Sequence, residues 1–167
     1  MSRPLIAVDI CNTIADINRE LEKYFNVKTD EKYEVEQATK EWFNENKWVY
    51  LVAKPIEWSS EMLNVLAEVY DIVYLTARPE SAFNETKKWL KRHGYPDGML
   101  ISSTDKAKTY KELGCCLAID DSPKELENYL AHGCNVIAFR KPYNSQFADR
   151  LDWQGICRRY MRRSAVG

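Results

Sequence analysis

Short apolar runs alternate with amphipathic segments along most of the chain. Five runs are short enough to be strands that are buried on both faces of a sheet. They cover residues 5–8, 72–75, 99–101, 115–119 and 136–139. The pattern predicts a sheet whose strands are separated by helices.

The segments between these runs predict helices with recognisable ends. Apolar residues recur at helical spacing in 61–70. The segment 80–93 ends at Gly94 and has cations in its last turn, where they suit the helix dipole. A further helix begins after Ser122, in a capping box with proline at the first helical position, and ends at Gly133.

Strands that alternate with helices over more than 100 of the 167 residues predict an α/β fold. We expect an open parallel sheet with right-handed crossovers and helices on both faces. The length is enough for one core, so we expect a single domain over residues 1–167. In such sheets, ligands bind beyond the carboxyl ends of the strands.

One long segment interrupts the alternation. Between Asn12 and Pro55 a helical pattern is followed by a charged stretch and then by an aromatic cluster. We expect a small helical cap, residues 14–54, over the strand ends near Asp9. Its aromatic residues either pack the cap against the body or stack on a ring of the substrate, and the sequence leaves both open. They are Trp42, Phe43, Trp48 and Tyr50.

Polar residues stand where the predicted strands end. Asp9 follows the first strand, Thr76 the second, and the pair Asp120 and Asp121 follows the fourth. Carboxylates that converge from two strands repel one another unless a cation lies between them. The sequence therefore predicts a magnesium site at this edge of the sheet.

Composition and charge exclude several classes of protein. Lys and Arg number 24 against 25 Asp and Glu, so no overall positive field favours nucleic acid. We interpret the arginines of residues 158–163 as a solvated helix face. Five cysteines without a CxxC pair disfavour structural zinc. No apolar run approaches the roughly 20 residues of a membrane helix and no signal peptide is evident, so we expect a cytoplasmic protein.

Four motifs in a fixed order carry a family resemblance. IAVDICNTI, IVYLTARP, a lysine in TDKAKTYKELG, and LAIDDSP together resemble the haloacid dehalogenase (HAD) superfamily, whose members are mostly magnesium-dependent phosphohydrolases. The TARP motif, the cap directly after the first strand, and KPYN with a later Trp153 resemble the 5′(3′)-deoxyribonucleotidase-like branch. That branch removes phosphate from nucleoside monophosphates.

The resemblance implies roles for individual residues. Asp9 would be the nucleophile that forms an aspartyl-phosphate, and Thr76 would bind a phosphoryl oxygen. A lysine is needed to hold the anionic phosphate beside Asp9. The spacing favours Lys106 for this role over Lys108.

The same resemblance implies metal and substrate ligands. Asp9, Asp120 and Asp121 would bind Mg²⁺ together with the backbone carbonyl of Cys11. Asn12, Thr13 and Ala77 would contribute to substrate binding. Arg78 either pairs with a substrate phosphate or braces the site, and the sequence does not decide between these.

Cys11 departs from the family pattern, which has an aspartate at this position to protonate the leaving group and activate water. A thiol with a pKa near 8.5 is not a carboxylate base, and losing general acid–base help typically costs about 10²- to 10⁴-fold in rate. Asp16 is an alternative acid. A cysteine nucleophile is disfavoured, because the following residues offer neither glycines nor a nearby arginine.

These observations favour a phosphomonoesterase that acts on a small phosphorylated metabolite, with a nucleoside monophosphate as the leading candidate. Three alternatives follow from Cys11: an enzyme for substrates with good leaving groups, a phosphotransferase that dephosphorylates slowly, and a weakened module that binds a phosphorylated ligand. We expect no membrane or nucleic-acid partner. The sequence leaves monomer and homodimer open.

Overall fold

The computed structural model describes residues 3–29 and 35–164. Within them, six parallel strands form one sheet in the order β3-β2-β1-β4-β5-β6. The strands are β1 (Leu5–Val8), β2 (Asp71–Thr76), β3 (Met99–Ser102), β4 (Leu117–Asp120), β5 (Val136–Phe139) and β6 (Arg150–Leu151). The predicted α/β fold with a parallel sheet is confirmed.

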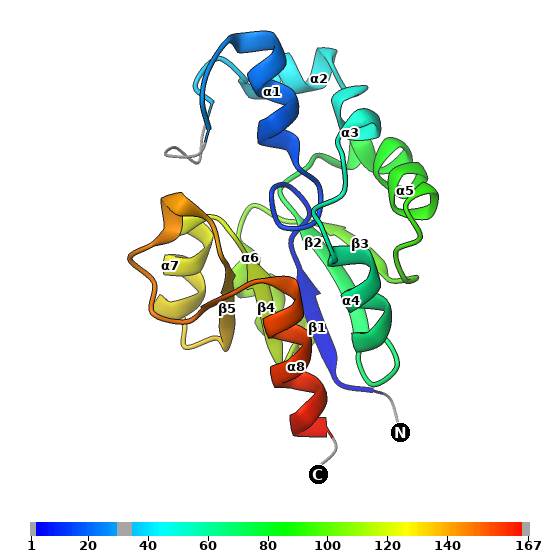
Figure 1. The fold of residues 1–167 in the computed structure, drawn as a ribbon, viewed down its shortest axis with the longest axis vertical. Helices are drawn as coiled ribbons and strands as arrows, with labels where there is room; N and C mark the ends of the chain where they lie inside the picture. The colour runs from blue at the N-terminus through cyan, green and yellow to red at the C-terminus, as the bar shows by residue number, and fades with distance from the viewer. Residues whose placement is uncertain (1–2, 30–34, 165–167) are drawn as a thin grey trace.

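Helices cover both faces of this sheet (Figure 1). The helices of the described chain are α1 (Ile17–Phe25), α2 (Lys40–Glu45), α3 (Val49–Val52), α4 (Ser59–Leu66), α5 (Phe83–Arg92), α6 (Lys106–Leu113), α7 (Pro123–Ala131) and α8 (Trp153–Ser164). Those that cover the faces of the sheet are α4 to α8. Two 3₁₀ turns are η1 (Glu80–Ala82) and η2 (Pro142–Asn144).

Alternate residues of the central strands β2, β1 and β4 build two separate cores. On β1, Ile6 and Val8 belong to the larger core with side chains of α4, α5 and α8. Ala7 points to the other face, where it joins Tyr110 of α6 and Tyr129 of α7. Both faces are covered, which explains why the strands are continuously apolar in sequence.

The strand register sets where the polar residues meet. Val8 is paired with Ile119, so the residues that follow them, Asp9 and Asp120, lie side by side at the carboxyl edge of the sheet. On the other side of β1, Val8 is paired with Tyr74, two residues before Thr76. The central strand therefore stands between both groups of site residues.

The segment between β1 and β2, where we expect a small cap, contains the helices α1, α2 and α3. Figure 1 shows α1, α2 and α3 above the carboxyl ends of the strands. Residues 30–34, which fall within the expected boundaries 14–54, lie outside the described residues. The cap aromatics contact one another: Trp42 has edge contacts with Phe43 and Trp48, and Phe43 stacks on Tyr50 at 5.6 Å. These contacts lie within the cap, so they leave both interpretations of the aromatic cluster open.

Some element boundaries differ from the sequence prediction. The helix predicted over 61–70 begins at Ser59 and ends at Leu66, and the chain then turns into β2 through bonds such as Val69 N–H to the Leu66 carbonyl, 3.1 Å. The segment predicted as a helix from residue 80 begins as η1. The two-residue strand β6 was not predicted, because two residues show no periodicity.

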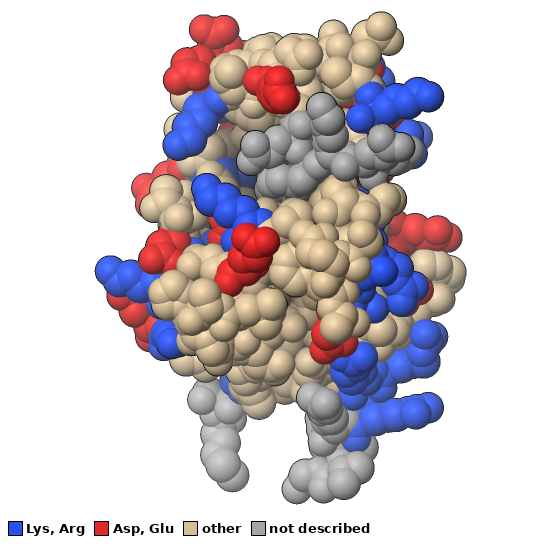
Figure 2. Space-filling model, turned by 90° about the vertical axis from the view of Figure 1, so that its left-hand side faces the viewer, with Lys and Arg blue, Asp and Glu red and all other residues tan. Residues whose placement is uncertain are grey.

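Helix α8 carries the basic residues near the end of the chain. Arg158 and Arg162 are exposed, and Arg159 pairs with Asp149 at 2.6 Å. The side chain of Arg163 lies outside the described residues. In Figure 2 most of the face is uncharged, and several basic side chains lie together toward its lower right. Among the described residues, no helix combines the length and apolar character that crossing a membrane requires.

The indole of Trp153 ties α8 to the loop after β1, which predicts a stability effect. Its Nε1 donates to the carbonyl of Thr13 at 2.9 Å, and the side chain is 1% exposed. Trp153→Phe should lower the free energy of unfolding by about 1–3 kcal/mol, because the buried carbonyl loses its donor. Urea denaturation measures this difference. The control Trp58→Phe, at a position that is 45% exposed, should change stability by less than about 0.5 kcal/mol; equal effects of the two changes would contradict the prediction.

Candidate active site

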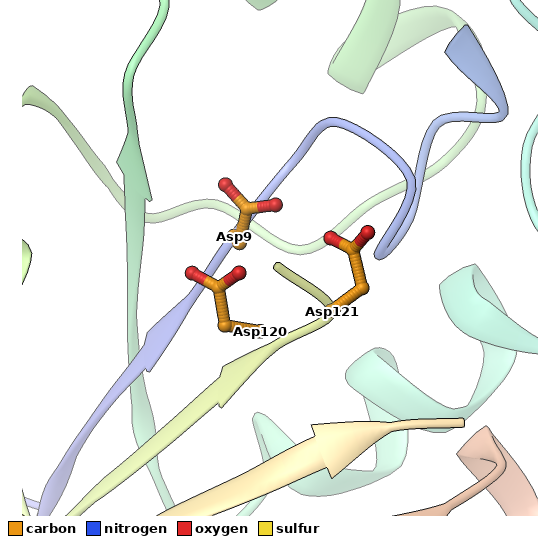
Figure 3. Close-up of side chains that lie close together, drawn as sticks. All are labelled: Asp9, Asp120 and Asp121. Carbon is orange, nitrogen blue, oxygen red and sulfur yellow. The ribbon is translucent and has the colours of Figure 1, made fainter. Parts of the chain in front are cut away.

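Three buried carboxylates meet where two neighbouring strands end. Asp9 follows β1, Asp120 is the last residue of β4, and Asp121 comes next. One oxygen of each lies within 4.8 Å of the others. Figure 3 shows the three carboxyl groups grouped around one space.

Lys106 lies among these carboxylates. Its Nζ donates to Asp9 Oδ1 at 2.7 Å and to Asp120 Oδ2 at 2.8 Å, and the residue is 2% exposed. Lys106 is the first residue of α6, and the N-cap Asp105 fixes that end by accepting from Lys108 N–H at 3.2 Å. The Lys108 side chain itself is exposed. Of the two lysines considered, the structure brings Lys106 to the site.

The cluster holds more negative charge than Lys106 offsets. Burial and the neighbouring Asp9 raise the pKa of Asp120 to about 7, against the opposing effect of Lys106. Burial, with Asp9 and Asp120 nearby, also raises the pKa of Asp121. Burial by itself would lower the pKa of Lys106, but Asp120 and Asp9 together hold it well above its usual value. The fully ionised cluster therefore favours uptake of protons or of a cation.

The donor set fits a hard divalent cation. The side-chain ligands are all carboxylate oxygens, which Mg²⁺ prefers. An oxygen that already accepts one hydrogen bond keeps a second lone pair for a metal. Asp9, Asp120 and Asp121 are the residues that would hold the ion, which would neutralise charge beside a phosphoryl group.

Hydrogen bonds from two other segments orient the carboxylates. Thr13 Oγ1 lies 3.2 Å from Asp9 Oδ2 and 2.9 Å from Asp121 Oδ1, so its hydroxyl bridges the two acids. The hydroxyl of Tyr143 donates to Asp121 Oδ2. Asn144 Nδ2 donates to the Asp121 carbonyl at 2.9 Å. Thr13, expected among the substrate contacts, is fully buried against the acids.

Tyr143 and Asn144 are the site residues for which the sequence had indicated no role. They belong to the KPYN segment, which in the sequence contributes only to the family resemblance. The one available signal was their position shortly after β5, the strand next to β4. Nothing in their spacing indicates that they contact Asp121.

The turn after β2 places Thr76 and its neighbours on the opposite side of β1. Thr76 is fully buried, and its Oγ1 accepts from Arg78 N–H at 3.1 Å. Ser102 Oγ, at the end of β3, donates to the Arg78 carbonyl at 2.7 Å. Ala77 is exposed in this turn. The turn is thus fixed from two sides.

Cys11 contacts a buried arginine. Arg78 Nε lies 3.2 Å from Cys11 Sγ, and Arg78 is 3% exposed. Burial raises the pKa of the Cys11 thiol, although Arg78 opposes the rise. The thiol is therefore neutral at pH 7, and it can offer no carboxylate base at this position.

Asn12 and Asp16 shape the beginning of the cap. Asn12 has φ 63°, a left-handed conformation that asparagine tolerates. Its Oδ1 accepts from Asn18 N–H at 2.9 Å, so its side chain caps the first turn of α1. Asp16 lines a polar cleft of about 70 Å³ between α1 and η2. The other lining residues are Asn18, Arg19, Thr29, Lys141, Pro142 and Tyr143.

Sequence comparisons connect the chain to nucleotidases. A family model described as 5′ nucleotidase, deoxy (pyrimidine), cytosolic type C protein (NT5C) matches residues 3–161. A Bacillus cereus protein named "Putative nucleotidase" is 32% identical over 101 residues, which are 57% of this chain and 53% of that protein. The match thus spans about half the length of this relative.

Structural comparisons give the same fold. A haloacid dehalogenase-like hydrolase from Streptococcus pneumoniae superposes with a TM-score of 0.65 at 12% identity, over 95% of this chain and 98% of the other. A class C acid phosphatase from Bacillus anthracis, with tungstate bound, gives 0.55 at 17% identity, over 86% and 68%. At these identities the likeness shows the HAD fold alone.

The raised pKa of Asp120 predicts that protons and Mg²⁺ compete for the site. Mg²⁺ binds the ionised carboxylate, so a protonated Asp120 must lose its proton before the metal binds. Below pH 7 the apparent affinity for Mg²⁺ should therefore fall by up to about tenfold per pH unit for each proton that is displaced. Isothermal titration of the protein with Mg²⁺ at pH 6 and 8 measures this. An affinity that does not change over this range would contradict the prediction.

The stability of the metal-free protein provides a control, because it should change with pH in the opposite direction to the affinity for Mg²⁺. The folded-state pKa of about 7 lies above the ordinary value of about 3.9, so this contribution to metal-free stability declines as the pH rises from about 4 through 7. Mg²⁺ should therefore raise Tm more at pH 8 than at pH 6. Asp120→Asn removes the titrating group and should weaken this pH dependence.

Proposed function

The chain belongs to the family of cytosolic type C 5′ nucleotidases, of HAD fold, and from that membership and its site we propose that it is a Mg²⁺-dependent phosphohydrolase. Its substrate is a small phosphorylated metabolite, with a nucleoside monophosphate as the leading candidate, and it acts in the cytoplasm. The observation that carries the proposal is the buried cluster in which Lys106 bonds to both Asp9 and Asp120.

The cluster supports Asp9 as the nucleophile. A carboxylate that attacks a phosphate ester must approach another anion, and like charges about 4 Å apart repel by about 4 kcal/mol at an effective dielectric constant of 20. Lys106 touches Asp9 at 2.7 Å and offsets part of this repulsion. Mg²⁺ held by the same carboxylates would supply the remaining positive charge. The buried hydroxyl of Thr76 is a candidate donor to a phosphoryl oxygen.

The reaction would proceed in two steps. An Asp9 oxygen bonds to phosphorus as the bond to the leaving oxygen breaks, and the electron pair of that bond leaves with the oxygen. Water then attacks the aspartyl-phosphate, which restores the Asp9 carboxylate and releases inorganic phosphate. The second step benefits from a base that accepts a proton from water.

Asp9→Asn tests the nucleophile. Mg²⁺-dependent phosphate release should fall at least about 10³-fold, because an amide does not form the intermediate. The assay measures phosphate release from nucleoside monophosphates, sugar phosphates and 4-nitrophenyl phosphate. The control Asp97→Asn removes an exposed acid and should leave the rate unchanged.

The same assay separates the enzyme from a binding module. If the wild type releases no phosphate from any of these compounds, yet binds a nucleotide in calorimetry, the phosphohydrolase proposal is overturned. Activity that is equal in wild type and Asp9→Asn would overturn the assigned nucleophile.

Cys11 favours a second candidate, a phosphotransferase or slow phosphatase. The thiol stands where a carboxylate would activate water, so dephosphorylation should be the slow step. With 4-nitrophenyl phosphate, rapid mixing should show a burst of nitrophenol equal to the enzyme concentration. Intact-mass measurement should detect the added phosphoryl group during turnover.

Cys11→Asp supplies the missing carboxylate and should remove the burst. Arg78 lies next to this position and would keep the new carboxylate ionised, which is the form a base requires. Steady-state turnover should rise about 10²-fold or more. Cys11→Ser is the matched control, because it adds no carboxylate. A wild type without a burst would contradict slow dephosphorylation.

A further inference from the structure

Arg78 is a buried cation, and one of its nitrogens has no hydrogen-bond partner among the described residues. The residue is 3% exposed, and its Nη2 makes no hydrogen bond within the described chain. In the same residues, no Asp or Glu forms an ion pair with it. Arg is almost never fully buried without a compensating charge. A guanidinium in this setting suits an anion that is supplied from outside the chain.

The guanidinium is held in one orientation. Its Nε contacts Cys11 Sγ at 3.2 Å, and its Nη1 donates to Thr86 Oγ1 at 3.1 Å. Its Cζ lies 4.2 Å from the centre of the Tyr50 ring. Thr86 is fully buried and donates onward to the Ala82 carbonyl at 2.8 Å. These contacts fix the plane of the group, while Nη2 is buried and has no hydrogen-bond partner among the described residues.

Arg78 and the acids Asp120 and Asp121 follow strands on opposite sides of β1. Arg78 follows β2, whereas Asp120 and Asp121 follow β4, and β1 with Asp9 runs between these strands. The guanidinium contacts the side chain of Cys11, which lies two residues after Asp9 in the chain.

We propose that Arg78 binds the leaving oxygen of the substrate and stabilises it as an anion. This inference rests on the proposed phosphohydrolase function. A guanidinium stays charged at any physiological pH and carries donors but no acceptor, so it neutralises charge without transferring a proton. Fixed donors aimed at developing charge are an effective form of catalysis.

Cleavage of the bond between phosphorus and the leaving oxygen needs no acid on the protein. Asp9 bonds to phosphorus, the bond between phosphorus and the leaving oxygen breaks, and that oxygen departs as an anion paired with Arg78. It takes its proton from solvent after release. Hydrolysis of the aspartyl-phosphate releases phosphate and one proton from the attacking water. This proton replaces the one that the leaving oxygen took from solvent.

The substrate preference follows from this charge distribution. Leaving groups that are stable as anions, such as those of acyl phosphates and aryl phosphates, need no proton and should react fastest. Alkyl esters such as nucleoside monophosphates should react more slowly on this active site. The order of rates is thus set by the pKa of the leaving group.

A series of aryl phosphates tests the proposal. The value of kcat/KM reports on the steps up to departure of the leaving group, so slow hydrolysis of the intermediate does not mask the effect. Arg78→Gln should lower kcat/KM by about 10²- to 10³-fold for phenyl phosphate, but only about tenfold for 4-nitrophenyl phosphate. The dependence on leaving-group pKa thus becomes steeper.

Conservative and distant variants complete the test. Arg78→Lys keeps the charge and should restore part of the wild-type dependence, whereas Arg158→Gln, on exposed α8, should change nothing. If Arg78→Gln does not fold, Thr86→Val carries the test, because it removes the acceptor of Nη1 and should steepen the dependence to a smaller extent.

The outcomes separate the inference from the function on which it rests. A uniform loss for all leaving groups would overturn the inference, because Arg78 would then bind a different phosphoryl oxygen or serve only the structure. Wild-type activity that requires Asp9 would keep the proposed function intact in that case. If the wild type is inactive on every aryl phosphate but releases phosphate from a nucleoside monophosphate, the inference fails and the proposed function stands. If it releases phosphate from neither class, both fail.

Discussion

The imbalance of charge at the carboxyl edge of the sheet is the constraint on which the rest of the site depends. Three buried carboxylates share one ammonium group, so the cluster is stable only if it takes up protons or a cation. In the metal-free chain, burial and the nearby carboxylate of Asp9 raise the pKa of Asp120. Parallel pairing of β1 with β4 makes the convergence unavoidable, because both strands end at the same edge.

The surrounding structure holds these repelling groups together. Lys106 is the first residue of α6, so the start of this helix places it beside the acids. The hydroxyl of Thr13 bridges Asp9 and Asp121. Trp153, from the last helix, bonds to the carbonyl of Thr13. Distant parts of the chain thus act on the same two acids, and the stability of α8 is coupled to the geometry of the site.

The sequence allowed the sheet and the acidic cluster to be predicted, because both are consequences of local pattern. Five apolar runs match β1 to β5, and residues that follow neighbouring parallel strands must be close in space. The contacts of Tyr143 with Asp121 and of Arg78 with Cys11 follow no such rule. They join residues 22 and 67 positions apart through side chains whose directions depend on the folded loops, so no spacing indicates them.

The cysteine at position 11 affects the two halves of the proposed reaction differently. Departure of the leaving group requires only that negative charge be stabilised, and a fixed guanidinium can do this without a proton. Attack by water requires a base, and neither the neutral thiol of Cys11 nor the cation of Arg78 can accept a proton. A site of this composition therefore favours formation of the aspartyl-phosphate over its hydrolysis. The lifetime of that intermediate decides whether the phosphoryl group passes to water or to another acceptor.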